Sequence, residues 1–161
     1  MKTNKMKKVL IALDYDPTSQ KIAEQGYKMA KAMGAEVTLL HVVVDSALYS
    51  SVYANMGVWQ IDTLDTFDTL EAFKNLKTGS RNFLEKAKRH LADKSIQTIQ
   101  KEGDTAQMIL ETSKEINADF IVMGSHSQKW LENILIGSVT EEVLRKTTIP
   151  MFIIPTKKRD K

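Results

Sequence analysis

The chain has 161 residues, of which 42% are hydrophobic and 27% charged, and it contains no cysteine. This length fits one folded domain, and the lack of cysteine excludes disulfides, thiol redox chemistry and thiolate metal sites. The formal net charge of +3 is small, and part of it comes from the basic run at 157–161, which argues against a nucleic-acid-binding surface.

The first predicted element is a short strand over 8–13, which ends in the apolar run Val-Leu-Ile-Ala-Leu. A continuous apolar run of this length is typical of a strand that is buried on both faces of a parallel sheet. Apolar or small residues then recur at helical spacing over 22–33, and Gly34 follows where a C-cap is expected. A second buried strand over 37–44 completes a βαβ unit with a right-handed crossover.

The middle of the chain is less regular. Residues 45–66 show neither the helical nor the strand period, and we interpret them as a long connection or a lid. From Thr69 to Leu91 apolar residues return at helical spacing and predict a long helix that is interrupted only by Gly79. Residues 95–101 alternate imperfectly between apolar and polar types, which favours a half-exposed edge strand over a central one.

A further strand and helix follow. Gly103 and Asp104 offer a turn and an N-cap for a helix through 106–116. The apolar run at 119–123 predicts another buried strand. A loop with some apolar content is expected over 124–136.

The chain closes with one more helix and strand. Ser138 and Glu141 have the spacing of a capping box, which predicts a helix from Ser138 to about Lys146. The last strand is expected at 150–154. Strands that alternate with helices throughout predict an α/β fold, namely a five-stranded open parallel sheet with helices on both faces, as in Rossmann-like domains.

We expect one domain over residues 1–161, with flexible tails at 1–5 and 156–161. No apolar run approaches the roughly 20 residues that cross a bilayer, and the start of the chain does not resemble a signal peptide. We therefore expect a cytoplasmic protein that contacts neither membrane nor nucleic acid.

Candidate ligand-binding residues can be selected from this fold alone. In an open parallel sheet, ligands bind beyond the carboxyl ends of the strands, where the strand order reverses. The selected positions are Ala12, Leu13 and Asp14, then 41–43, then Met123 onward. The Asp14 carboxylate is the acidic group at the end of the first buried strand and is placed to accept hydrogen bonds from ribose hydroxyls. The alternative is that Asp14 is a turn or cap residue.

A glycine and serine pattern follows the fourth strand. Gly-Ser-His-Ser at 124–127 is followed, after nine residues, by Gly-Ser-Val-Thr at 137–140. Glycine lets the backbone approach a phosphate, and a helix N-terminus presents free N–H groups and a positive dipole end to it. The hydroxyls of Ser127, Ser138 and Thr140 are candidate donors. The pattern predicts a phosphate-binding loop; the alternative is that the second glycine serves only a turn.

At these residues the chain resembles the ATP-binding branch of the universal stress protein family. That branch carries glycine, two residues, glycine, nine residues, then glycine and serine or threonine, and residues 123–140 follow it except at Ser127, where a glycine is expected. Because serine resists positive φ, this departure bears on loop geometry and affinity. The resemblance extends to further segments: 12–14, 40–42, 103–104, 118–126 and 149–154.

The resemblance implies a binding site for ATP or a related adenine nucleotide, with Mg²⁺. Asp14 would hold the ribose, and the backbone near Val42 would meet the adenine. The phosphates would be surrounded by Gly124, Ser127, Gly137, Ser138, Val139 and Thr140. Two further expected site residues are Met123 and His126. The resemblance also implies a homodimer formed through the C-terminal strand; the alternative is an edge strand protected by Pro150, Pro155 and the charged tail.

The sequence contains no Gly-Lys-Ser/Thr phosphate loop, no pair of carboxylates at metal-binding spacing and no Ser/His/Asp arrangement that fits the fold. His41, His90 and His126 are scattered, and we interpret His41 as a packed strand residue. We therefore expect a regulatory stress protein that binds ATP, with slow hydrolysis at most. The alternative is a dimeric interaction module of the same family that binds no nucleotide. A nucleotidyl-transfer enzyme is less well supported, because residues 14–17 lack a histidine motif.

Overall fold

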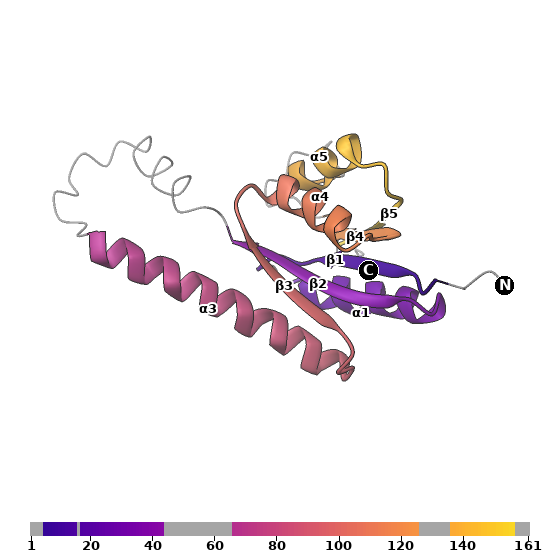
Figure 1. Cartoon of the computed structure of the whole chain (residues 1–161), viewed down its shortest axis with the longest axis horizontal. Helices are drawn as coiled ribbons and strands as arrows, with labels where there is room; N and C mark the ends of the chain where they lie inside the picture. The colour runs from indigo at the N-terminus through magenta and orange to yellow at the C-terminus, as the bar shows by residue number, and fades with distance from the viewer. Residues whose placement is uncertain (1–4, 16, 44–65, 126–135, 157–161) are drawn as a thin grey trace, which may run out of the picture.

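The computed structural model describes residues 5–15, 17–43, 66–125 and 136–156 (Figure 1). Strands and helices alternate along this part of the chain, which confirms the predicted α/β fold. The elements are β1 (Lys8–Ala12), α1 (Ser19–Ala32), β2 (Glu36–Val43), α3 (Thr66–Leu91), β3 (Gln97–Glu102), α4 (Thr105–Glu115), β4 (Phe120–Gly124), α5 (Ser138–Lys146) and β5 (Met151–Ile154).

The described strands form a five-stranded sheet in the order β3-β2-β1-β4-β5. Every neighbouring pair is parallel. The chain builds the sheet outward from β1 to β3, then returns to the other side of β1 for β4 and β5. The order therefore reverses between β1 and β4, and the carboxyl edge at this point is where such sheets bind ligands.

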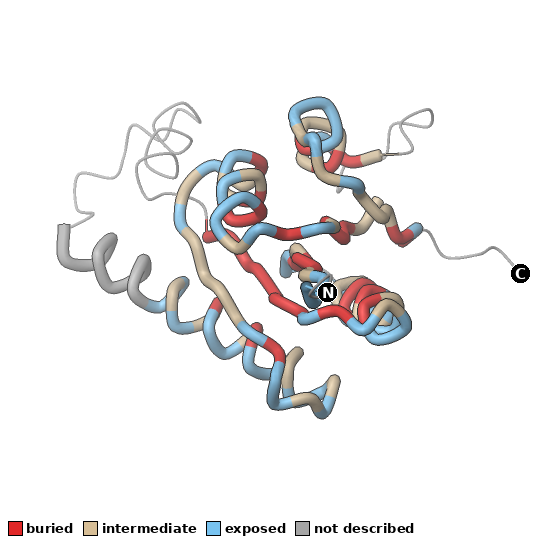
Figure 2. The backbone as a smooth tube through the Cα atoms, turned by 45° about the vertical axis from the view of Figure 1, so that its right-hand side comes forward, coloured by how far each residue is buried: buried red, intermediate tan, exposed pale blue. Residues whose placement is uncertain are grey.

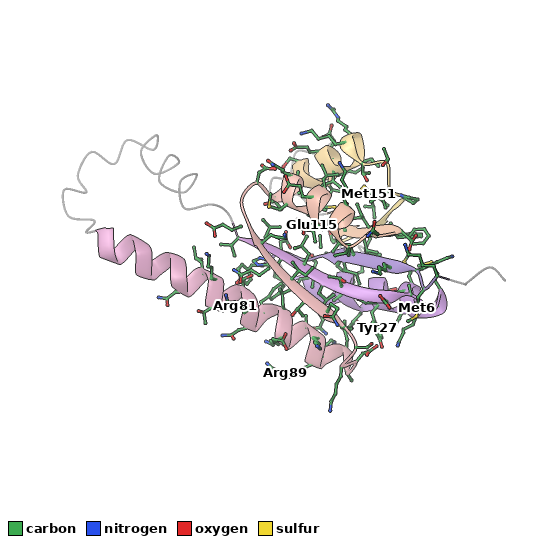
Figure 3. All side chains as sticks on the ribbon, in the orientation of Figure 1. Met6, Tyr27, Arg81, Arg89, Glu115 and Met151 are labelled. Atoms are coloured by element: carbon green, nitrogen blue, oxygen red, sulfur yellow. The ribbon has the colours of Figure 1, made fainter. Side chains whose placement is uncertain are left out.

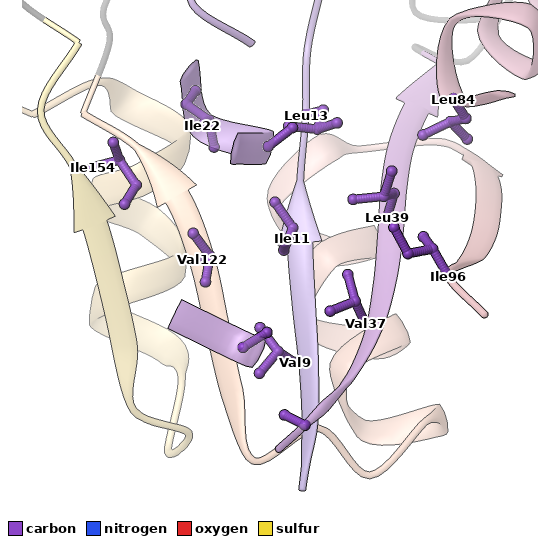
Figure 4. Packing of buried hydrophobic residues seen from close by; sticks show 13 residues of the cluster. Val9, Ile11, Leu13, Ile22, Val37, Leu39, Leu84, Ile96, Val122 and Ile154 are labelled. Carbon is purple, nitrogen blue, oxygen red and sulfur yellow. The ribbon is translucent and has the colours of Figure 1, made fainter. Parts of the chain in front are cut away.

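Alternate residues of the strands contribute to two hydrophobic cores, one on each face of the sheet. Val9 and Ile11 point to the face covered by α1 and α3, where they pack with Ile22 and Leu84 (Figure 4). Leu10 points to the opposite face, which is covered by α4 and α5. Figure 2 shows the buried residues concentrated along the strands and on the inner sides of the helices.

The strands β3 and β5 form the two edges of the sheet. All central residues of β3 are of intermediate burial, which confirms the predicted half-exposed edge strand. β5 forms the opposite edge and, among the described strands, pairs with β4 alone.

Two helix ends follow the expected local chemistry. Gly34 has a φ of +63°, its N–H donates to the Lys31 carbonyl at 3.0 Å, and the N–H of Ala35 donates to the Ala30 carbonyl at 2.9 Å. These two bonds form a Schellman motif, so the left-handed backbone explains the glycine. At the start of α4, the Asp104 carboxylate accepts a hydrogen bond from the Gln107 N–H at 2.8 Å, which confirms the predicted N-cap.

The predicted capping box at Ser138 is wrong, although α5 does begin at that residue. The N-cap is Gly137, whose backbone is extended at φ −66° and ψ 154°. Its carbonyl accepts the first helical hydrogen bond, from the Glu141 N–H at 2.9 Å. The Glu141 carboxylate accepts instead from Arg145, at 2.5 Å.

Some predicted boundaries differ from the structure. Thr156, assigned above to the flexible C-terminal tail, is only 8% exposed, and its N–H donates to the Ser125 hydroxyl oxygen at 3.1 Å. The ordered chain therefore extends past β5. α3 starts at Thr66 and runs through Gly79 without a break. The predicted lid at 45–66 lies, except for Thr66, outside the described residues.

Within the described residues, none of the helices combines the length and apolar character that a membrane span requires.

Candidate functional site

The end of β1 places Asp14 beyond the sheet. Ala12 is the last residue that pairs with β2, opposite Leu40, and the Leu13 N–H donates to the Leu40 carbonyl at 2.9 Å. Leu13 is buried, whereas Asp14 is exposed. The carboxylate of Asp14 thus emerges at the carboxyl edge of the central strand, next to the point where the strand order reverses.

The backbone of Val42 faces the same region. Leu40 directs its carbonyl toward β1, whereas Val43 directs its carbonyl toward β3, where the Gly103 N–H donates to it at 3.0 Å. Because these directions alternate along a strand, the N–H and C=O of Val42 point to the β1 side. They lie past Ala12, where the β1–β2 ladder ends.

The neighbouring His41 is a packing residue, as the sequence indicated. Its side chain is only 4% exposed, and its Nδ1 lies 2.6 Å from the Ser80 hydroxyl of α3. Burial lowers the pKa of His41 to about 4, so the ring is neutral at physiological pH. The ring of Tyr15, 53% exposed, packs on His41 with a centroid distance of 4.4 Å, and Phe83 lies 5.0 Å from Tyr15.

Gly124, at the end of β4, directs its backbone N–H and C=O toward β1. The N–H groups of Ile121 and Ser125 donate toward β5, so the N–H and C=O of Gly124 point to the β1 side. A Cβ atom at Gly124 would collide with Ile22 and come within 3.1 Å of Thr156 Cγ2. Close packing is therefore sufficient to explain why this residue is glycine.

The first turn of α5 is tied to the end of β4. The Gly137 N–H donates to the Ser125 carbonyl at 3.1 Å, and the Thr140 hydroxyl donates to the Gly124 carbonyl at 2.9 Å. An α-helix provides no internal acceptor for its first N–H groups, which here belong to Ser138, Val139 and Thr140. These groups lie at the carboxyl edge, beside the end of β4.

One predicted phosphate contact, that of Thr140, changes in light of these bonds. The Thr140 hydroxyl uses its hydrogen on Gly124, so Thr140 offers its backbone N–H rather than the predicted hydroxyl. Ser138 is exposed and Val139 is half-buried. His126 and Ser127 lie outside the described residues. Met123 is buried in the core beneath α4 and α5.

Sequence reasoning missed Ser125 and Thr156. The Thr156 side chain lies next to Gly124, and the hydroxyl oxygens of Ser125 and Thr156 are 3.4 Å apart. Ser125 is part of the pattern at 124–127, but its partner comes 31 residues later, and no local period points to such a pairing.

Among the described residues, no group of three or more His, Asp or Glu side chains could hold a metal ion. Of the described residues predicted for the site, Asp14 alone carries a carboxylate.

Comparison with known proteins identifies a family. The model of the universal stress protein family matches residues 5–155. The universal stress protein MJ0577 of Methanocaldococcus jannaschii is 30% identical over 157 residues, which cover 94% of this chain and 96% of that protein. A solved structure of MJ0577 has a TM-score of 0.69, with 27% identity and coverage of 94% and 97% of the two chains.

Two more distant structures share the fold. A universal stress protein in complex with cAMP has a TM-score of 0.63 and 17% identity, and the match covers 94% of this chain and 98% of that one. A universal stress protein from Archaeoglobus fulgidus in complex with dAMP has a TM-score of 0.56 and 16% identity, with 92% and 97% covered.

Proposed function

The chain belongs to the universal stress protein family, and on that premise we propose that it binds an adenine nucleotide, ATP, at the carboxyl edge between β1 and β4. The observation that carries this proposal is the junction of β4 with α5. The hydrogen bonds from Gly137 to Ser125 and from Thr140 to Gly124 hold the helix N-terminus beside the strand end. The N–H groups of the first turn would then face the phosphates, and the helix dipole would favour their negative charge.

The adenosine would lie at the same edge of the sheet, beside the ends of β1 and β2. The Asp14 carboxylate is exposed and would accept hydrogen bonds from the ribose hydroxyls. The N–H and C=O of Val42 point to the β1 side and offer a donor and an acceptor to the edge of the base. The cAMP and dAMP complexes of two structural relatives support adenine as the base. Mg²⁺ would enter with the phosphates of the nucleotide, since the described side chains offer no cluster for it.

Nucleotide binding of this kind would serve regulation. We infer a cytoplasmic stress-response protein that changes its partners with its nucleotide state and hydrolyses ATP slowly at most. We also propose that it is a homodimer joined through β5, the edge strand of the sheet.

One observation favours the alternative, an interaction module without nucleotide. Gly124 and Thr140 both have structural partners of their own, because Gly124 packs against Ile22 and Thr156 and Thr140 binds the Gly124 carbonyl. These two residues would therefore be required by the fold even if no ligand were bound.

Mass spectrometry of the natively purified protein, combined with a thermal shift in millimolar MgATP, tests the proposal. We expect a co-purifying adenine nucleotide or a rise in melting temperature. Protein that carries no nucleotide and shows no shift would favour the interaction module.

Gly137→Val tests the phosphate loop itself. The backbone of Gly137 at φ −66° and ψ 154° is open to any residue, so the variant adds a branched side chain without backbone strain. We expect it to weaken ATP binding at least tenfold, about 1.4 kcal/mol, by blocking the approach of the phosphates. Calorimetry on the folded variant gives the affinity, and Gly137→Ala, with a smaller side chain, should show a smaller loss. Unchanged affinity in the valine variant would exclude this loop as the phosphate site.

A further inference from the structure

We propose that Ser125 and Thr156 are positioning residues for the phosphate end of the nucleotide site. They contact no phosphate themselves and act by holding the end of β4 and the first turn of α5 in place. The inference rests on the proposed nucleotide site and adds the segment that follows β5 to it.

Ser125 joins three parts of the chain. Its N–H donates to the Ile154 carbonyl at 2.9 Å, which extends the β4–β5 ladder, and its carbonyl accepts from the Gly137 N–H at 3.1 Å. Its hydroxyl oxygen accepts from the Thr156 N–H at 3.1 Å. One residue thereby links β4 to the N-cap of α5 and to the chain beyond β5.

Thr156 holds Ser125 from behind. It is 8% exposed, its hydroxyl lies 3.4 Å from that of Ser125, and its Cγ2 fills the space next to Gly124. The preceding residue is tied to α1, because Lys21 Nζ donates to the Pro155 carbonyl at 2.6 Å. The segment after β5 therefore contacts both α1 and the end of β4.

The phosphate groups would be bound by the first N–H groups of α5, which Ser125 and Thr156 hold in place. Gly124 packs against Thr156, and its carbonyl accepts a hydrogen bond from the Thr140 hydroxyl. The Gly137 N–H donates to the Ser125 carbonyl. Loss of the Ser125 hydroxyl would release the Thr156 N–H and let the β4 end shift relative to α5. The first N–H groups of α5 would then lose their alignment, whereas Asp14 and Val42, on β1 and β2, would keep theirs.

The test compares ATP with adenosine by calorimetry. In the full-length Ser125→Ala variant we expect ATP affinity to fall about fivefold to tenfold, the range that one net hydrogen bond supports. Adenosine affinity should stay unchanged, because adenosine lacks the phosphates. Ser125→Thr keeps the hydroxyl and should restore most of the ATP affinity.

Ser113→Ala is the matched control. Ser113 is also buried, and its hydroxyl donates to the Leu110 carbonyl at 2.7 Å, but it lies on α4, away from the site. A merely structural hydroxyl should lower the melting temperature without changing the ratio of ATP to adenosine affinity. If Ser125→Ala does not fold, Thr156→Ala decides by the same ratio, with a smaller expected loss.

The outcomes separate the two proposals. Wild-type protein that binds neither ligand would overturn the nucleotide site and this inference together. Wild-type protein that binds ATP, with a Ser125→Ala ratio equal to that of Ser113→Ala, would overturn the positioning role alone.

Discussion

At the scale of single residues, the buried hydroxyl groups differ in how they are satisfied. The hydroxyls of Ser80, Ser113 and Thr140 each have a protein partner. Thr112 on α4 is fully buried, and its hydroxyl has no hydrogen-bond partner in the described part of the chain. A buried hydroxyl without a partner has lost its bonds to water without replacement, which costs about 1–3 kcal/mol.

Thr112→Val should therefore stabilise the fold. Valine has nearly the same shape as threonine and is also β-branched, so the packing and the helix propensity of α4 change little, while the unpaired hydroxyl is removed. We expect the free energy of unfolding to rise by about 1 kcal/mol, measured by urea denaturation. The neighbouring Ser113→Ala, which removes a satisfied hydroxyl, should lower it instead. A less stable valine variant would mean that Thr112 has a partner, such as a buried water.

Asp14→Ala separates the two ends of the proposed nucleotide site. The carboxylate is expected to bind ribose hydroxyls, so its loss should weaken ATP about tenfold, the scale of a hydrogen bond to a charged group. Inorganic triphosphate has no ribose, and its affinity should change little. Competition calorimetry with both ligands measures the difference. Equal losses for the two ligands would show that the substitution damages the fold or the phosphate loop rather than a ribose contact.

The site residues that could be predicted from the sequence are those that follow a strand or open a helix. Asp14 and Gly137 lie at such points, and the structure places them at the carboxyl edge, although their binding of nucleotide stays a prediction. The capping box failed because the spacing at Ser138 also fits a helix whose cap is one residue earlier. Ser125 and Thr156 could not be predicted, since their hydrogen bond joins residues 31 positions apart in the sequence that only the tertiary fold brings together.

At the scale of secondary structure, α1, α3 and α4 of the described helices are each followed by a residue with left-handed backbone. Gly34 follows α1, Asn117 follows α4 with a φ of 54°, and Ala92 follows α3 with a φ of 54°. Glycine and asparagine tolerate this conformation, whereas alanine is strained there by the contact of its Cβ with the backbone. The end of α3 is therefore the least favourable of the three.

Ala92→Gly should stabilise the protein. Ala92 is exposed, so no packing is lost, and glycine relieves a strain of about 1–2 kcal/mol. Glycine also increases the entropy of the unfolded chain, which offsets part of the gain. We expect a net increase in unfolding free energy of about 0.5–1 kcal/mol, measured by thermal or urea denaturation. Asn117→Gly is the matched control and should gain less; a destabilised Ala92→Gly variant would contradict the assigned backbone conformation.

The helices and strands themselves were well predicted by local patterns. Continuous apolar runs predicted β1, β2 and β4 because a strand covered on both faces cannot alternate. The weaker alternation of β3 correctly indicated an edge. The ends of the elements were predicted less accurately, since α3 begins three residues before its predicted start at Thr69. The predicted start was set by the first residue of the apolar period, whereas a helix can begin before that period does.

At the scale of the whole molecule, polar contacts hold α3 to its neighbours, to α1 at its C-terminal end and to β2 near its middle. Near the end of α3, the Tyr27 hydroxyl (labelled in Figure 3) donates to the Asp93 carboxylate at 2.8 Å, and Lys31 Nζ lies 2.9 Å from it. At the carboxyl edge, His41 binds Ser80 on α3. The α1–α3 layer next to the proposed adenosine position is thus held by polar contacts as well as by the core.

The free edge of the sheet predicts a homodimer joined through β5. Its residues Met151, Phe152 and Ile153 are apolar and only half-buried, and among the described strands β5 pairs with β4 alone. An open edge exposes unpaired N–H and C=O groups, and soluble proteins usually cover such edges. Pairing with β5 of a second chain about a two-fold axis would cover both the backbone and the apolar side chains.

Light scattering at micromolar concentration measures the assembly, and we expect a mass of about two chains. Ile153→Lys should convert the dimer to a monomer, because it places a charge on the half-buried edge strand β5 while the buried Ile154 keeps its contacts. Gln97→Lys is the matched control: it adds the same charge to the exposed start of β3, at the opposite edge, and should leave the dimer intact. Circular dichroism verifies that both variants fold. A wild-type mass of one chain would refute the dimer. A dimer that survives Ile153→Lys but dissociates with Gln97→Lys would move the interface to β3.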